Sequence, residues 1–327
     1  MKSFIDGQQV WMFSGQGSQY YQMGLDLYES DEVFRATMDW CSEQVSGALD
    51  EPLTSLLFRA RADRYAPFDR TLHTHLALFS IQYSMAQTLL HRGHKPVAIM
   101  GYSLGEWVGH VVAERVSSEV VLDLLARQGQ RAEAVCPRGG MLAVFAPPEI
   151  ADLRPDWFSE TWVVARNFDE HFVVSGLRES VDAVERRLKE RNITTQLLPV
   201  SHAFHTPMMD ALRSDCLAAL SALTFEPAST RLWSARGEEV THAEPAKALW
   251  NAIRDAVEFG EVVAAIEAEG KPVYVDCGPA GTLANFVKYN LPKEQQHRCV
   301  TIMTSFGKNV ARLEGLGAAR VAAGGQA

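Results

Sequence analysis

The chain has 327 residues, of which 47% are hydrophobic and 22% are charged. These proportions exclude a collagen-like or disordered chain, because there is enough apolar surface to offset the entropy lost on folding. The 40 acidic and 31 basic side chains give a net charge of −9, which argues against non-specific nucleic-acid binding, since that needs a basic surface.

The N-terminal part alternates between strand-like and helix-like segments. Residues 10–13 have the pattern of a short strand that ends in a glycine-rich turn at residues 14–19. Residues 74–92 are apolar at helical spacing. Residues 96–100 have the pattern of a buried strand, which turns sharply at residues 101–105 into another helix. Strand, tight turn and helix in this order indicate α/β architecture.

The middle of the chain has a different pattern, with short strands and helices in the order β-α-β-β-α-β. This order is typical of the ferredoxin-like split βαβ unit. The predicted strands are residues 141–146, 162–165, 172–175 and 194–200, and the predicted helices are 148–153 and 179–191. A helix at residues 207–220 and a strand at 272–276 then return to the first pattern.

A large α/β domain with a small α+β insertion fits these patterns best. We expect residues 1–137 and 206–315 to form the large domain and residues 138–205 to form the small subdomain. Residues 316–327, which are rich in Ala and Gly, are expected to be an unstructured C-terminal tail.

Cysteine usage and the polarity of the N-terminus indicate a reducing compartment. Five cysteines occur and none forms a CxxC pair, so we expect free thiols. The first ten residues lack the apolar core of a signal peptide, and the longest apolar runs are too short to span a bilayer. We therefore expect a cytoplasmic protein, a monomer, that binds neither membrane nor nucleic acid. No P-loop, GxGxxG or HExxH motif is present, so we expect no metal and no nucleotide.

The turn at Gly101-Tyr102-Ser103-Leu104-Gly105 matches G-x-S-x-G, the nucleophile elbow. A serine at this position lies on a strained turn between strand and helix, so its hydroxyl is exposed. The backbone N–H of the next residue points at the developing oxyanion. The pentapeptide alone also occurs by chance as a glycine-rich turn, but here it has the strand-then-helix context of an elbow. Ser103 is therefore the predicted nucleophile.

A serine hydroxyl needs a neighbouring base to act as a nucleophile at neutral pH. His202 and His205 follow the last predicted strand of the insertion and precede a helix, which is a suitable place for a general base. Taken alone, a histidine of this kind is more often a core or solvated residue than a base. His91, His94 and His171 are expected to be surface histidines.

Three motifs resemble the acyl-carrier-protein acyltransferase family, which includes malonyl-CoA transacylases and the acyltransferase domains of polyketide synthases. The motifs are Phe-Ser-Gly-Gln-Gly-Ser-Gln at 13–19, Gly-Tyr-Ser-Leu-Gly-Glu at 101–106 and His-Ala-Phe-His at 202–205. The resemblance extends over roughly residues 8–310, including 254–259 and 275–281. It implies a hydrolase-like large α/β domain with an inserted ferredoxin-like subdomain.

The resemblance also implies residue roles. Ser103 is the acylated nucleophile, and His205 is the general base, oriented by a backbone carbonyl near Glu258. Gln16 and Leu104 supply the oxyanion hole. The implied mechanism is ping-pong, in which Ser103 attacks a thioester and a second acceptor then removes the acyl group. The acyl group arrives on the phosphopantetheine of an acyl carrier protein or coenzyme A, so these are the expected partners and no resident cofactor is implied.

Further positions are implied to contact the substrate, and several depart from the family's pattern. The implied substrate-binding residues are Tyr102, His75, Asn167, His202, Phe204 and Gln128. Tyr102 and His75 stand where the family usually has His and Gln. Malonyl-type members bind the free carboxylate with an arginine 25 residues after the serine, and here that position is Gln128. A neutral amide cannot replace the bidentate pair of an arginine.

Gln128 therefore suggests an acyl group without a carboxylate. The alternative, that Arg127 or Arg131 turns inward and malonyl is still used, stays open. A chain of this kind resembles the acyl hydrolases of trans-acyltransferase polyketide pathways, which pass stalled acyl groups to water. A transferase that loads malonyl or another acyl unit onto a carrier protein would use the same Ser–His pair.

Two other classes compete with an enzyme that acts on acyl thioesters. An ordinary esterase would leave the Gln16 turn and the insertion unexplained, and a non-catalytic carrier-docking module would not need Ser103 and His205 together. Basic residues that could dock an acidic carrier protein are Arg186, Arg187, Lys189, Arg191 and Lys288, although such clusters are more often a solvated helix face.

Overall fold

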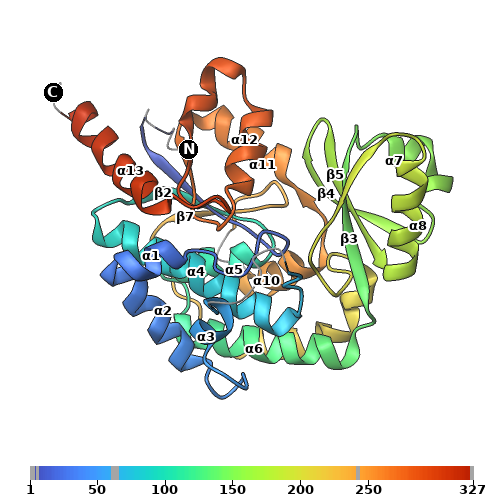
Figure 1. The fold of residues 1–327 in the computed structure, drawn as a ribbon, viewed down its shortest axis with the longest axis horizontal. Helices are drawn as coiled ribbons and strands as arrows, with labels where there is room; N and C mark the ends of the chain where they lie inside the picture. Colours follow the sequence, from blue (N-terminus) through green and yellow to red (C-terminus); the bar gives the residue numbers. More distant parts are fainter. Residues whose placement is uncertain (1–3, 5–6, 60–65, 241–243, 325–327) are drawn as a thin grey trace.

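The computed structural model describes residues 4, 7–59, 66–240 and 244–324 and contains two five-stranded sheets (Figure 1). The expected α/β architecture with a small α+β part is confirmed. Within the described residues, no helix is both long and apolar enough to cross a membrane. The two sheets have separate apolar clusters, of which the larger surrounds the first sheet and the smaller lies between the second sheet and its helices.

The larger sheet is parallel throughout, with the strand order β10-β9-β1-β2-β7. Its strands are β1 (Gln9–Phe13), β2 (Pro96–Gly101), β7 (Arg231–Ser234), β9 (Val273–Asp276) and β10 (Cys299–Thr301). β1 is central and almost wholly buried, as expected for a parallel strand that is covered on both faces. Because β1 and β2 run in parallel, the turns that follow them meet at one edge of the sheet.

Helices cover both faces of the larger sheet, with α5 packed on β1 and β2 and α12 packed on β9 and β10 (Figure 1). The helices are α1 (Leu25–Ser30), α2 (Glu32–Gln44), α3 (Leu53–Leu57), α4 (Thr71–His91), α5 (Leu104–Val112), α6 (Ser118–Val135), α9 (Arg213–Ser221), α10 (Pro245–Arg254), α11 (Phe259–Glu269), α12 (Thr282–Asn290) and α13 (Asn309–Gly324), with 3-10 helices η2 (Pro207–Leu212) and η3 (Lys293–Arg298).

The smaller sheet has the order β6-β3-β5-β4-β8, and α7 and α8 lie on its outer side in Figure 1. Its elements are β3 (Gly139–Phe145), α7 (Ile150–Leu153), η1 (Pro155–Trp157), β4 (Thr161–Phe168), β5 (His171–Leu177), α8 (Arg178–Lys189), β6 (Thr194–Leu197) and β8 (Val257–Glu258). The first four strands in this order are antiparallel and follow the predicted β-α-β-β-α-β sequence.

β8 is a strand that the sequence did not predict. It comes from the segment between α10 and α11, outside the insertion, and it pairs in parallel with β4 through Ala165 and Val257. The small sheet is thereby extended by a strand of the large domain. Arg166 and Glu258 strengthen this joint with an ion pair of 2.9 Å.

The C-terminal segment differs from the expectation of an unstructured tail from residue 316. α13 continues to Gly324, and residues 325–327 lie outside the described part of the chain. The reason is composition, because alanine has the highest helix propensity and residues 317–324 are rich in it. Leu313 and Leu316 in this helix pack into the core.

The turn between β2 and α5 is built around glycines that leave no room for a side chain. A Cβ on Gly105 would lie 1.9 Å from the carbonyl oxygen of Phe13, and one on Gly101 would lie 2.4 Å from Cα of Glu106. Ser103 between them has φ 54° and ψ −116°, a conformation that L-residues rarely adopt. The sequence pattern of the elbow is thus explained by close backbone packing.

We expect Gly105→Ala to lower the free energy of unfolding by about 2 kcal/mol or more, because the added methyl group meets backbone that cannot move aside. Gly47→Ala is the matched control, because nothing lies within 4 Å of the added Cβ, and its effect should stay within about 0.5 kcal/mol. Denaturant unfolding of both variants measures the difference. Equal stabilities would contradict the packing described for the elbow.

Candidate active site

Ser103 and His205, which lie 102 residues apart in the chain, are joined by a hydrogen bond of 2.9 Å between Ser103 Oγ and His205 Nε2. On the other side of the ring, His205 Nδ1 lies 2.7 Å from the backbone carbonyl oxygen of Asp255. A carbonyl oxygen can only accept, so Nδ1 carries the proton and Nε2 is left to accept from the serine hydroxyl. This is the arrangement that a general base needs.

The orienting carbonyl belongs to Asp255 at the end of α10, three residues before the position near Glu258 that the resemblance implied. The carboxylate of Asp255 faces Arg236 instead, at 3.6 Å. The backbone N–H of His205 donates to the carbonyl of Ile253, so the end of α10 holds both the backbone and the ring of the histidine. His205 itself has φ 62°, which is unusual for a residue with a side chain.

Burial tunes the base. His205 is buried, and the loss of hydration lowers the pKa of its imidazole to about 4, against which the Asp255 carbonyl and carboxylate act only partly. The ring is therefore neutral at physiological pH and can accept a proton.

The glycine-rich turn after β1 lies directly against the nucleophile. A Cβ on Gly15 would come within 3.0 Å of Ser103 Cβ, which explains why glycine occupies this position. The amide side chain of Gln16 donates to Thr74 Oγ1 at 2.6 Å, so it is the backbone N–H of Gln16 that could serve an oxyanion hole. Leu104 begins α5, where backbone N–H groups have no partner within the helix. The oxyanion roles of Gln16 and Leu104 stay predictions.

Gln82 anchors the glycine-rich turn after β1, and this role of Gln82 was not predicted from the sequence. It is buried on α4 and makes two hydrogen bonds with the backbone of Ser14, accepting from the N–H at 2.6 Å and donating to the carbonyl at 3.0 Å. A polar residue within a long apolar helix was the available signal, because a buried amide must find partners.

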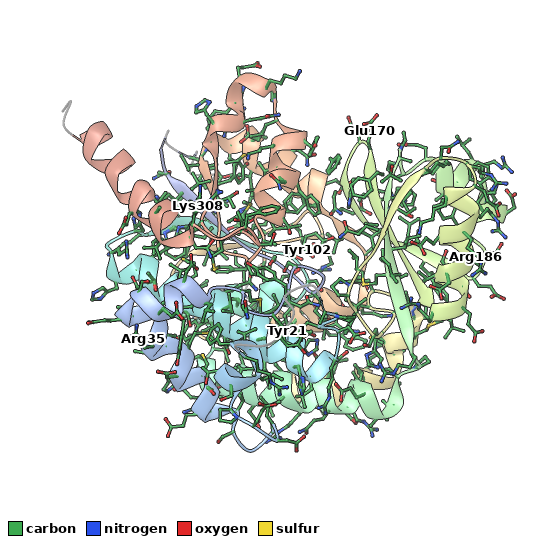
Figure 2. All side chains as sticks on the ribbon, in the orientation of Figure 1. Tyr21, Arg35, Tyr102, Glu170, Arg186 and Lys308 are labelled. Atoms are coloured by element: carbon green, nitrogen blue, oxygen red, sulfur yellow. The ribbon has the colours of Figure 1, made fainter. Side chains whose placement is uncertain are left out.

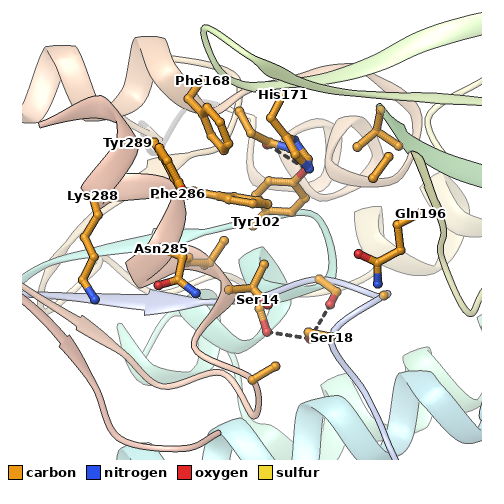
Figure 3. Close-up of a pocket in the computed structure, with 18 of the residues that line it drawn as sticks. Ser14, Ser18, Tyr102, Phe168, His171, Gln196, Asn285, Phe286, Lys288 and Tyr289 are labelled. Carbon is orange, nitrogen blue, oxygen red and sulfur yellow. Dashed lines mark hydrogen bonds between the residues drawn. The ribbon is translucent and has the colours of Figure 1, made fainter. Parts of the chain in front are cut away.

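A cavity of about 680 Å³ opens beside the glycine-rich turn after β1 (Figure 3). Its lining comes from this turn, from the smaller sheet, and from α12 and η3. Tyr102 and Asn167 both line it, and the Tyr102 hydroxyl donates to Asn167 Oδ1 at 3.1 Å. The Asn167 amide in turn donates to His171 Nδ1 at 3.0 Å. The expectation of a surface position for His171 is wrong, since only 4% of it is exposed, and burial lowers its pKa to about 4. His94 is likewise buried.

His75, His202 and Phe204 form a second group, which does not line this cavity. The ring of Phe204 lies 5.9 Å from that of His75 and 6.3 Å from that of His202. Thr71 Oγ1 and His202 Nδ1 are 2.7 Å apart. All three side chains are buried, and burial lowers the pKa of His75 to about 4. Their packing supports the segment that carries His205.

Gln128 lies on α6 and lines a separate cavity of about 330 Å³ that also includes Trp107 and Cys216. Its amide is 3.8 Å from Cys216 Sγ. The neighbouring Arg127 and Arg131 line the same cavity, but each is paired with a carboxylate. Arg127 pairs with Asp123 and Arg131 with Asp215, each at 2.9 Å, and these guanidinium side chains are 72% and 50% exposed. Among the described residues, no group of three His, Cys, Asp or Glu side chains could hold a metal ion.

We expect Ser103→Ala and His205→Ala each to reduce turnover of an acyl thioester by about a thousandfold or more, because each removes one half of the hydrogen-bonded pair. Ser46→Ala and His91→Ala, which change exposed residues, are the matched controls and should retain full activity. Thiol release measures the rates. Substantial activity in both site variants would mean that the nucleophile is misassigned.

The pH profile tests the environment of His205. Only the neutral ring can accept a proton, so kcat/KM should stay level from pH 8 to about 5 and fall as the pH drops through about 4. A histidine with an ordinary pKa would lose half its activity near pH 6.5. A neutral acyl thioester is the substrate, and circular dichroism checks that the protein remains folded. A half-loss near 6.5 would contradict the buried, neutral base.

Comparison with known proteins identifies the family of the chain. Residues 10–323 match the model of the acyl transferase domain. The chain is 33% identical over 304 residues to the polyketide biosynthesis acyltransferase homolog PksD of Bacillus subtilis, covering 93% of this chain and 94% of PksD. It is also 33% identical to the homolog BaeD of Bacillus velezensis, again covering 93% and 94%.

Among solved structures, the acyltransferase domain from the second module of the salinomycin polyketide synthase superposes with a TM-score of 0.80 at 29% identity. That match covers 94% of this chain and 72% of the other. The family match and the extent of these similarities agree, and the chain belongs to the acyl transferase domain family of polyketide biosynthesis.

Proposed function

We propose that this enzyme removes acyl groups without a free carboxylate from carrier-protein or coenzyme A thioesters, through an ester on Ser103, and passes them to water. The observation that carries the proposal is the relay from Ser103 through His205 to the Asp255 carbonyl, combined with a neutral Gln128 at the position of the family's carboxylate-binding arginine. Such a reaction would clear stalled or unsuitable acyl units from a polyketide assembly line.

The geometry supports the following steps. As Ser103 Oγ attacks the thioester carbonyl, His205 Nε2 takes the hydroxyl proton, and backbone N–H groups of Leu104 and Gln16 stabilise the oxyanion. The C–S bond breaks, and His205 returns the proton to the departing thiol. Water then attacks the serine ester while His205 removes its proton, and Ser103 leaves as the hydroxyl with that proton. In each half of the reaction, the imidazole of His205 accepts one proton and returns it to the leaving group.

The acyl specificity rests on charge. A malonyl carboxylate placed near Gln128 would lack a bidentate cation partner of its own, which is unfavourable by several kcal/mol where the site is desolvated. Arg127 and Arg131 line the same cavity, and both already have carboxylate partners. A malonyl carboxylate would have to displace one of these partners, so a neutral acyl group is the better fit.

Transfer to a second carrier thiol is the alternative, and the family's name and the printed names of PksD and BaeD favour it. The first half of the reaction is the same. A carrier protein loaded with a labelled acyl group, incubated with enzyme and an unloaded acceptor carrier, separates the two outcomes. Free acid as the main product supports hydrolysis, whereas label on the acceptor supports transfer.

We expect the enzyme to prefer a butyryl over a malonyl thioester by about tenfold or more in kcat/KM, because Gln128 offers no charge to the carboxylate. Gln128→Arg should raise the relative rate for malonyl by restoring a bidentate partner. Gln44→Arg on the exposed side of α2 is the matched control for added charge. A malonyl preference in the unaltered enzyme would overturn the specificity argument.

A further inference from the structure

The large cavity has an unusual charge for this protein. The whole chain carries 40 acidic residues and a net charge of −9. Yet the described residues that line the cavity include Lys288 and Lys293 and not a single Asp or Glu. His171, the remaining titratable base in the lining, is kept neutral by burial. The cavity is therefore locally positive, and it should attract an anionic group.

The two lysines come from adjoining elements of the cavity lining. Lys288 is in the last turn of α12, and Lys293 begins η3. The Gln296 amide donates to the Lys288 carbonyl at 2.8 Å, which ties η3 to the end of α12. Within the described part of the chain, neither lysine forms an ion pair with a carboxylate. Both ammonium groups are thus free to bind a ligand.

The rest of the cavity is neutral and largely aromatic. Phe286 lies between Tyr102 and the end of α12 that carries Lys288. The rings of Tyr102 and Phe286 are 6.4 Å apart. Phe168 stacks on Tyr289 at 4.4 Å, and 70% of Tyr289 is exposed. Figure 3 shows Lys288 and Asn285 on one side and the Tyr102–His171 group on the other. The cavity thus has a neutral region at Tyr102, the residue that precedes the nucleophile, and a cationic region on α12 and η3.

We propose that Lys288 and Lys293 bind the phosphate of the phosphopantetheine arm that carries the acyl group. This inference rests on the proposed function, because it takes a thioester on that arm as the substrate. With the thioester at Ser103, the arm's amides and alkyl chain meet the neutral aromatic wall. Its phosphate ester, the one anion that every such arm has at its far end, meets the two lysines. Lysine ammonium groups bind phosphate well as compact charges.

The basic residues of α8, the other group expected to dock a carrier, are less suited to this role. Arg187 donates to the backbone carbonyls of Asp156 and Trp157. Arg191 stacks over the Trp157 ring. Lys189 pairs with Glu185. α8 also lies on the outer side of the small sheet, and Figure 2 shows Arg186 there, far from Tyr102 in the centre. These cations therefore stabilise the subdomain's own helix.

Paired substrates test the proposal. S-butyryl phosphopantetheine and S-butyryl pantetheine differ only in the phosphate, so the ratio of their kcat/KM values isolates its contribution. In the unaltered enzyme this ratio should favour the phosphorylated arm. The double variant Lys288→Glu/Lys293→Glu should lower the ratio about tenfold or more, mainly through KM. Arg186→Glu/Lys189→Glu is the matched control, since it changes the net charge equally at α8 and should keep the ratio.

Each other outcome has a defined meaning. A ratio that the double variant leaves unchanged overturns the proposal. A loss of kcat/KM in the double variant that is restricted to malonyl thioesters also overturns the proposal, because the lysines would then bind the acyl carboxylate. If the double variant loses kcat/KM with butyryl-coenzyme A but not with butyryl carrier protein, the lysines bind the phosphates of the nucleotide. That result contradicts the phosphate of the arm as the ligand. Failure of the proposed function is distinguishable, because both butyryl substrates would then be poor substrates in the unaltered enzyme.

Discussion

The hydrogen bond between Ser103 and His205 depends on how the small subdomain is inserted into the large domain. The base follows the last strand of the insertion, so the chain must return to the elbow at the end of that strand for the two side chains to meet. The end of α10 then holds the histidine through the carbonyls of Ile253 and Asp255. β8 follows immediately and pairs with β4, which fixes α10 and the small sheet to each other. The hydrogen bond between Ser103 and His205 therefore depends on how the two domains are placed relative to each other.

The energetics of this site combine backbone strain with burial. Ser103 and His205 both have positive φ, which is unfavourable by about 1–3 kcal/mol for each residue and persists only where the surrounding packing enforces it. The glycines of the elbow and Gly15 allow that packing, because backbone and nucleophile approach too closely for a Cβ. Burial then keeps the imidazole neutral, and a backbone carbonyl orients it, so the base needs no carboxylate to set its tautomer.

Much of this arrangement could be predicted from local sequence patterns. The elbow and the β-α-β-β-α-β order each follow from residue spacing over a short stretch, whereas the choice of His205 over His202 as the base was implied by the family resemblance. What could not be predicted depends on contacts between distant segments. β8 has only two residues and forms because β4 offers an edge. The burial of His171 results from Phe145, Phe168 and Phe286 packing around it. Gln82 gains its role only when α4 meets the turn after β1.

The substrate specificity that we propose depends on one neutral side chain and on where the cations lie. The position of the family's arginine holds Gln128, and the cavity lined by Tyr102 and the glycine-rich turn places its cations on α12 and η3. This separation suits an acyl group without charge on an arm that carries a phosphate. It also gives meaning to the acidic composition, because a local absence of carboxylates in the described cavity lining matters more for binding than the net charge.

The most direct test of this account is the intact mass of the enzyme after brief mixing with equal amounts of butyryl and malonyl carrier protein. We predict a butyryl adduct that is absent in Ser103→Ala and that decays to free acid on standing. A malonyl adduct as the main species, or a butyryl adduct that persists in Ser103→Ala, would contradict it.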